Sequence, residues 1–124
     1  MEYLQNVYKT NFLIQERLTQ SSFFARFNES SVNTLRIATY RNVTSGEISV
    51  IGAVIRIGGK GSFVDNACSG GSFVGVDMNG KLSNFACDEY GVKRSVYNGI
   101  DFSKEEFIIP NWDKIKIFVI DVAR

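Results

Sequence analysis

The alternation of apolar and polar side chains predicts two neighbouring strands in the first half of the chain. Residues 33–42 and 47–57 are rich in β-branched side chains, which favour strands. The Ser45-Gly46 pair between them is typical of a turn. Because this connection is short, the two strands are expected to pair as an antiparallel hairpin.

A second hairpin is predicted from residues 73–78 and 81–87, which flank Asn79 and Gly80. An Asn-Gly pair between two strands is typical of a type I′ turn, because both residue types tolerate the positive φ angles that this turn requires. The sequence therefore predicts a two-residue connection at this point.

Helical periodicity is strongest at the two ends of the chain. Leu4, Val7 and Tyr8 lie at helical spacing near the start. Near the end, residues 112–124 favour a helix with Asn111 as its N-cap, although their β-branched content would also suit a strand. The apolar stripe of this helix would consist of Trp112, Ile115, Phe118, Val119 and Val122.

Shorter elements complete the predicted fold. Residues 11–17 alternate as in a strand, residues 21–27 favour a short helix, and residues 28–31 favour a turn. Together the elements predict one α+β domain over residues 1–124, an antiparallel β-sheet with flanking helices. Since both ends fall within predicted helices, we expect the chain to be a partial domain excised from a longer protein.

Composition allows a buried core and argues against several kinds of partner. The chain has 44% hydrophobic residues and 10 Phe, enough for a core. Its 14 basic and 13 acidic residues give a net charge of +1 without a run of one sign, which argues against nucleic acid. No apolar run approaches the roughly 20 residues that span a bilayer. With its 2 Cys interpreted as reduced thiols, we expect a cytoplasmic protein.

The absence of histidine narrows the possible chemistry. Because the chain contains no His, Ser-His and Cys-His nucleophiles, a His general base and most zinc sites are excluded. Any catalysis must use Arg, Lys, Asp, Glu, Asn, backbone N–H groups or residues outside this chain.

The first candidate ligand loop is the glycine-rich segment at residues 58–62, which follows a predicted strand. Its backbone N–H groups could face an anion, and Lys60 could add positive charge. The spacing is not that of a P-loop. A flexible connection between strands is the more common explanation for an isolated glycine cluster.

The second candidate ligand loop, at residues 64–71, has a more specific composition. Asp65 and Asn66 supply side-chain oxygens, Asn66 adds N–H donors, and the Gly70-Gly71 pair allows a ligand to approach the backbone closely. An Asx-type turn closed by glycines is an equally good explanation.

Two arginines lie inside otherwise apolar predicted strands. Arg36 shares a strand face with Ala38 and Tyr40, and Arg56 shares one with Val54. A guanidinium on a sheet face needs an acidic partner or a phosphate, or else it lies on a solvated outer face. Because both predicted strands lead toward the glycine loops, we favour binding of a phosphate or carboxylate.

Several short motifs follow one another along the chain. They are NFLIQERL at 11–18, NTLRIAT at 33–39, AVIRIG at 53–58, the DN…GG…VD…GKL block at 65–82 and IPNW at 109–112. In this order they resemble the ATP-grasp superfamily, and most closely the sugar-transfer-associated ATP-grasp proteins. The resemblance covers nearly the whole chain and implies the central antiparallel portion of an ATP-grasp domain.

The resemblance implies roles for particular residues. The residues implied to line the adenine pocket, mainly through backbone atoms, are Gln15, Glu16 and Leu18. Three residues are implied to act in catalysis: Arg36 and Arg56, which would face phosphates or an acyl phosphate, and Asn66, which would hold the acceptor substrate or the γ-phosphate. The residues implied to form the substrate or phosphate loops are Lys60, Asp65, Gly70 and Gly71.

The implied activity is part of an ATP-dependent carboxylate–amine (or related) ligase, and the resemblance also implies a role in the biosynthesis of cell-surface polysaccharide. Its cofactors would be ATP and Mg²⁺, and its substrates a small carboxylate and an acceptor. The family's upstream lysines and its Glu-x-Asn metal motif have no counterpart here, so we assign no metal ligand. We expect this chain, without the rest of its parent chain, to bind ATP weakly or not at all and to be inactive.

Two non-catalytic alternatives remain open from the sequence. One is a small ligand-binding or interaction domain whose glycine loops are only turns. The other is a degenerate nucleotide-binding domain with a regulatory role.

Overall fold

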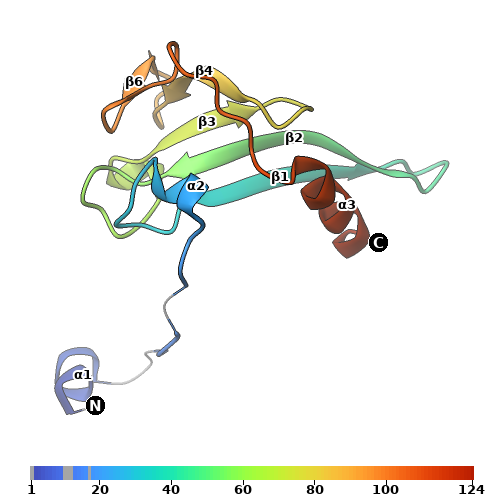
Figure 1. Ribbon diagram of the computed structural model, residues 1–124. Helices are drawn as coiled ribbons and strands as arrows, with labels where there is room; N and C mark the ends of the chain where they lie inside the picture. The colour runs from blue at the N-terminus through green and yellow to red at the C-terminus, as the bar shows by residue number, and fades with distance from the viewer. Residues whose placement is uncertain (1, 10–12, 17) are drawn as a thin grey trace.

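The computed structural model describes residues 2–9, 13–16 and 18–124 and shows a five-stranded antiparallel sheet (Figure 1). Its strands, in spatial order, are β1 (Thr34–Arg41), β2 (Ile48–Ile57), β3 (Ser72–Val76), β4 (Leu82–Cys87) and β5 (Lys93–Arg94). A two-stranded sheet pairs β6 (Val96–Tyr97) with β7 (Ile100–Asp101). The helices are α1 (Glu2–Tyr8), α2 (Ser22–Ala25), α3 (Trp112–Val122) and the 3₁₀ helix η1 (Ala67–Ser69). The predicted α+β class is confirmed.

The first predicted hairpin is confirmed in β1 and β2. The two strands are antiparallel, with Thr34 opposite Arg56 at the open end of the hairpin. At the closed end, the N–H of Gly46 donates to the carbonyl of Asn42 at 2.8 Å. Gly46 has φ 73°, a left-handed conformation that glycine adopts without strain.

The second hairpin joins β3 and β4 as predicted, but the predicted type I′ turn is wrong. Of the two central residues, Gly80 has a positive φ (82°) and Asn79 does not. The carbonyl of Asp77 accepts the N–H of Gly80 at 3.1 Å, and its carboxylate accepts those of Asn79 (2.8 Å) and Lys81 (2.9 Å). The Asp77 side chain therefore organises a longer turn, with Gly80 as its left-handed residue.

The Asn-Gly signature does form a two-residue turn, but between β6 and β7. Asn98 has φ 51° and Gly99 has φ 83°, so both central residues are left-handed as a type I′ turn requires. Sequence analysis did not single out this pair, because the strands that flank it are only two residues long.

The strand predicted at residues 11–17 is wrong within the part of that segment that the structure describes. Residues 13–16 have no regular secondary structure, and Leu13 is 80% exposed. Residues 11, 12 and 17 lie outside the described residues. An alternating pattern gives a strand only where a neighbouring strand can pair with it, and no described strand pairs with residues 13–16.

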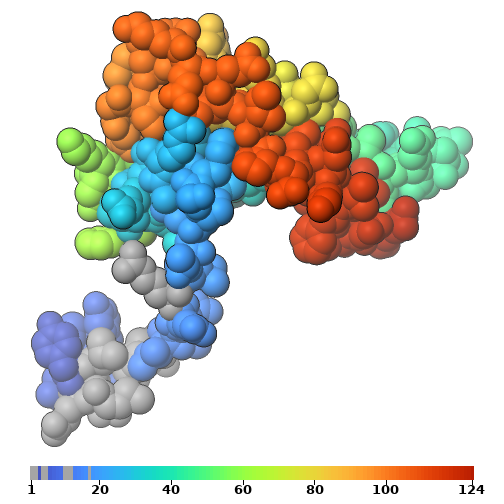
Figure 2. Space-filling model, in the orientation of Figure 1, coloured from blue at the N-terminus to red at the C-terminus, as the bar shows by residue number. Residues whose placement is uncertain are grey.

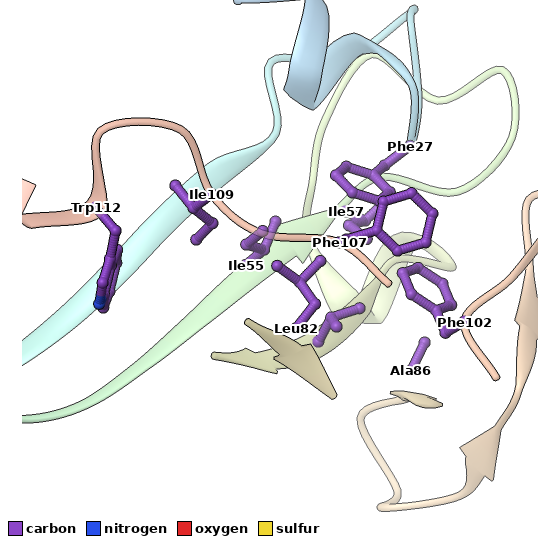
Figure 3. Packing of buried hydrophobic residues seen from close by; sticks show 10 residues of the cluster. Phe27, Ile55, Ile57, Leu82, Ala86, Phe102, Phe107, Ile109 and Trp112 are labelled. Atoms are coloured by element: carbon purple, nitrogen blue, oxygen red, sulfur yellow. The ribbon is translucent and has the colours of Figure 1, made fainter. Parts of the chain in front are cut away.

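The hydrophobic core lies on one face of the five-stranded sheet, which we call the core face and which carries Ile55 and Ile57 of β2 and Val74 of β3. Figure 1 shows α2, α3 and the segment that leads from β7 to α3 on the same side of the sheet. Figure 3 shows the side chains that fill the space between these layers. The rings of Phe27 and Phe102 stack there, with their centroids 5.9 Å apart.

The predicted C-terminal helix is confirmed as α3, with Asn111 at its N-cap position as predicted. Asn111 has φ 57° and makes no capping hydrogen bond with its side chain, but its carbonyl accepts the N–H of Ile115 at 3.1 Å. The predicted apolar stripe is split, because Trp112 is buried whereas Phe118 is 67% exposed. Figure 2 shows α3 at the margin of the molecule, so the sheet covers only part of its apolar surface.

Candidate functional site

The register of β1 and β2 brings both predicted arginines to one face of the sheet. Thr34 lies opposite Arg56, and Arg36 lies opposite Val54. Arg36 and Arg56 are therefore diagonal neighbours, with backbones about 7–8 Å apart. Residues of β2 alternate between the two faces, so this face lies opposite the one that carries Ile55. We call it the arginine face.

Arg56 is held in place by the second candidate ligand loop, residues 64–71, which we call the second glycine loop. Its Nη2 lies 3.3 Å from Asp65 Oδ1 and donates to the Asp65 backbone carbonyl at 3.3 Å and to Asn66 Oδ1. The other carboxylate oxygen of Asp65 accepts a hydrogen bond from the Thr34 hydroxyl. The two ionic side chains are only 12% and 14% exposed. Shielding from water strengthens this pair and limits the motion of the guanidinium.

One polar atom of Arg56 has no partner among the described residues. Its Nε is buried and has no hydrogen-bond partner among the described residues. Buried N–H groups in proteins normally have a partner, so this atom marks a place where one is missing. Of the residues in this cluster, Thr34 was not identified from the sequence, because its contact depends on the path of the loop.

Arg36 is exposed and has no ion pair or hydrogen bond within the described residues. It lies at the rim of a shallow hollow of about 500 Å³ on the sheet. Gly52 and Gly75 contribute no side chains to the floor of this hollow, and Val54 makes it apolar. A flat apolar floor beside an unpaired guanidinium suits a ligand with a planar part and an anionic part.

The glycines of the second loop are required by the backbone itself. Gly70 ends η1 with φ 82°, and a Cβ on Gly71 would lie 2.6 Å from the carbonyl oxygen of Asn66. The N–H of Gly71 donates to that same carbonyl at 3.1 Å. These contacts favour the glycine-closed turn that sequence analysis left open, and they leave Asp65 and Asn66 as the residues that reach the arginine face.

The first candidate ligand loop, residues 58–62, which we call the first glycine loop, has an exposed tip and is held by a hydrogen bond where it begins. Lys60 is exposed and has no ion pair within the described part of the chain. Gly58 is buried, and its N–H donates to Asn33 Oδ1 at 3.1 Å. A Cβ on Gly59 would lie 2.8 Å from the carbonyl oxygen of Gly70, so the two glycine loops touch.

Asn33, the first residue of the NTLRIAT motif, is a structural residue that sequence analysis missed. It is buried, and besides Gly58 its Oδ1 accepts from the Ser31 hydroxyl at 2.9 Å. Its amide group donates to the carbonyls of Phe24 and Asn28, each at 2.9 Å. A buried amide with all these partners fixes the loops around it. A polar residue immediately before an apolar strand was the available signal.

The residues predicted for the adenine pocket are not brought together with the arginines. Gln15, Glu16 and Leu18 are exposed and belong to no helix or strand. Figures 1 and 2 show the segment that leads to α2 extending away from the sheet. The arginine face and the second glycine loop therefore form the candidate site in this structure.

Metal-binding groups and membrane-spanning helices were searched for in the described residues. That part of the chain has no cluster of three or more His, Cys, Asp or Glu side chains that could hold a metal ion. None of its helices combines the length and apolar character needed to cross a bilayer. Cys68 is exposed, Cys87 is half-buried, and both are free thiols.

Comparison with known proteins identifies the family. The family model of the sugar-transfer associated ATP-grasp proteins matches residues 5–124. The chain therefore belongs to the sugar-transfer associated ATP-grasp family, and the predicted resemblance is confirmed. Membership supports an ATP-grasp, ligase-like role, in a class of proteins that generally uses ATP and Mg²⁺. No match was found among curated proteins or among solved structures.

Proposed function

We propose that this chain supplies one wall of the active site of an ATP-dependent carboxylate–amine (or related) ligase. The observation that carries the proposal is the pairing of two arginines on one sheet face, one held by Asp65 and the other unpaired beside a hollow. The family's general use of ATP gives these guanidinium groups an anionic ligand to bind.

In this proposal the two arginines have different tasks. Arg56 is already held by Asp65 and Asn66, so it can stabilise charge that develops in the transition state without first reorganising. Arg36 has freedom to move and would bind the phosphates or carboxylate of the ground state. Lys60, at the exposed tip of the first loop, would add long-range attraction for anions.

The described residues fit an anion better than they fit Mg²⁺. Guanidinium groups are available on the arginine face, whereas the described carboxylates form no cluster of three. The role proposed for this chain is therefore to bind and orient the anionic group. When bound, Mg²⁺ would neutralise phosphate charge, and residues elsewhere in the parent protein would hold it.

The adenine-binding role of Gln15, Glu16 and Leu18 remains part of the proposal. Because these residues lie in an exposed segment, they would have to approach the arginine face when ATP binds. Closing of a segment over a ligand is a common step in ATP-dependent enzymes. We further propose a cytoplasmic site, small-molecule carboxylate and acceptor substrates, and a place in cell-surface polysaccharide biosynthesis.

The decisive test is the substitution Arg56→Ala in the full-length protein. It should lower kcat for ATP turnover by about 100-fold or more, because an oriented charge in the transition state is lost. The control is Arg26→Ala, which removes an exposed arginine paired with Glu105, and it should leave turnover unchanged. Equal turnover in Arg56→Ala and the parent protein would refute the proposal.

A binding experiment separates this chain from its parent. Titration of the isolated chain with Mg-ATP should produce little or no saturable shift of its amide NMR signals, because only one wall of the site is present. Tight, saturable binding would show that the nucleotide site lies within this chain.

A non-catalytic binding or interaction domain is the second candidate. It is favoured by the glycines at 70 and 71, because the left-handed φ of Gly70 and the close backbone contacts of Gly71 explain these residues without any ligand. In that case both arginine substitutions, Arg56→Ala and Arg26→Ala, would leave the turnover of the full-length protein unchanged.

A further inference from the structure

Two adjacent residues of the turn between β6 and β7 each hold one of the glycine loops. The Tyr97 hydroxyl donates to the carbonyl oxygen of Gly70 at 2.6 Å. The Asn98 amide donates to the carbonyl oxygens of Gly58 and Phe27, each at 2.9 Å. This short hairpin therefore connects two loops that are separated along the sequence.

The point of attachment is also the point where the loops touch. The carbonyl oxygen of Gly70 lies against Gly59, where a Cβ would approach to 2.8 Å. On its other side this oxygen accepts the Tyr97 hydroxyl. The Tyr97 hydroxyl is protonated at neutral pH and can donate, since the ordinary pKa of tyrosine is 10.0 and burial raises the pKa of Tyr97 further.

The type I′ turn directs the Asn98 side chain toward the loops. Asn98 has φ 51°, a conformation that few residues with a side chain adopt readily apart from Asn and Asp. Glycine adopts the same conformation but carries no amide to donate. Asn98 thus combines a backbone requirement with two hydrogen bonds from one side chain.

The loops carry the groups that set the orientation of Arg56. Asp65 and Asn66 lie near the start of the second loop and contact the Arg56 guanidinium, and Gly58 lies two residues after Arg56 in the chain. A shift of either loop would therefore change the position of Arg56 relative to its carboxylate and amide partners.

We propose that Tyr97 and Asn98 are positioning residues for Arg56. By fixing both glycine loops, they orient the guanidinium toward the anion on the arginine face. The catalytic consequence rests on the proposed function, whereas the coupling between the hairpin and Arg56 rests on the contacts alone. The two parts can therefore be tested separately.

The first experiment measures the coupling in the isolated chain by NMR. Tyr97→Phe removes only the hydroxyl, and Asn98→Gly keeps the left-handed turn but removes the amide. Each variant should speed the exchange of the Gly71 N–H, which donates to Asn66, about five- to tenfold. The Arg56 Nε–H should exchange faster as well.

Two controls distinguish positioning from a general loss of stability. Tyr90→Phe makes the same change on a tyrosine that is 83% exposed, and it should alter neither signal. The N–H of Gly80, which donates to Asp77 in a separate turn, should keep its exchange rate in every variant. Unchanged signals of Arg56 and Gly71, or equal acceleration at Gly80, would overturn the proposal.

The second experiment measures kinetics in the full-length protein. Tyr97→Phe should lower kcat about three- to tenfold and change KM for ATP less than twofold. In the Arg56→Ala background it should have no further effect, because Tyr97 acts through Arg56. An equal additional loss in that background would overturn the positioning role. If Arg56→Ala itself leaves turnover unchanged, the proposed function fails, while the exchange data still decide the coupling.

Discussion

The two faces of the five-stranded sheet are built from alternate residues of the same strands, yet they differ in almost every physical respect. The core face carries Ile55, Ile57 and Val74, all 0% exposed, under a layer of phenylalanine rings. The arginine face carries Arg36 and Arg56 and has a shallow hollow where the core face has packed side chains. No described helix covers that hollow.

This difference separates stability from binding within single strands. On the core face, a missing atom leaves a cavity, and the cost is paid in folding free energy. On the arginine face, water can replace a missing atom, so the same loss should appear mainly in ligand binding. Adjacent residues of β2 should therefore respond to substitution in different measurements.

The largest effect is expected from matched valine substitutions on opposite faces. Val74→Ala on the core face should lower the free energy of unfolding by about 2 kcal/mol, because it leaves a cavity in a fully buried site. Val54→Ala, beside the hollow, should lower it by about 0.5 kcal/mol. Urea unfolding monitored by circular dichroism measures both, and equal losses would contradict the division between the faces.

A smaller effect is expected from Asp65, the well-shielded acid that pairs with Arg56. Asp65→Asn should lower the free energy of unfolding by about 1–2 kcal/mol, because it leaves the largely buried charge of Arg56 without its partner. Glu105→Gln is the matched control, since it breaks the exposed pair with Arg26 and should cost about 0.5 kcal/mol or less. The same unfolding experiment measures both variants, and a larger loss for Glu105→Gln than for Asp65→Asn would contradict this prediction.

Arg36→Ala should have almost no effect on stability. The Arg36 side chain is exposed and makes no ion pair or hydrogen bond with the described residues, so the free energy of unfolding should change by no more than about 0.5 kcal/mol. In the full-length protein the same substitution should raise KM for ATP several-fold with little change in kcat, as expected for ground-state binding. A large loss of stability would show that Arg36 has a structural partner.

The smallest effect is expected when the pH is lowered, and it should appear at the turn that follows β4. The Arg94 guanidinium and the Val92 N–H lower the pKa of Asp88 below its ordinary value of 3.8. The stabilising contribution of this carboxylate is therefore present above that value and is lost as the pH falls through the lowered pKa. As the pH falls below 3.8, the protection of the Val92 N–H against exchange, relative to an unfolded amide at the same pH, should decrease, whereas Asp88→Asn should abolish this change in protection.

The sequence predicted the strands well where the alternation extends over many residues. The predicted strands at 33–42 and 47–57 differ from β1 and β2 by no more than one residue at each end, because a long β-branched pattern has one face to bury. Residues 13–16 have a similar short pattern but no partner strand, and local sequence does not contain that information.

The turn between β3 and β4 could not be predicted from Asn79-Gly80 alone. The Asp77 carboxylate accepts two N–H groups and so competes with the tighter turn. The same arrangement recurs at Asp88, whose carboxylate accepts the N–H groups of Tyr90 and Val92. An aspartate three residues before a glycine was the signal in both places.

The sequence predicted which arginines and which loop belong to the candidate site, but it did not predict the contacts among them. Sequence analysis allowed each strand arginine an acidic partner, a phosphate or a solvated outer face, and the structure supplies Asp65 to Arg56 and leaves the Arg36 side chain exposed. Which of the two arginines receives an acidic partner depends on how the second glycine loop folds back over β2. Tyr97, far along the chain, holds that loop through its hydrogen bond to the Gly70 carbonyl.

The contact between Gly80 and Trp112 provides a built-in optical reporter. Trp112 is the only tryptophan of the chain; its ring lies against Gly80, where a Cβ would approach to 2.6 Å, and its indole N–H donates to the Met78 carbonyl at 2.9 Å. Its fluorescence therefore reports the docking of α3 on the β3–β4 turn. Because this contact is remote from the glycine loops, emission that stays constant during ligand titration would indicate that the scaffold remains intact while the binding face responds.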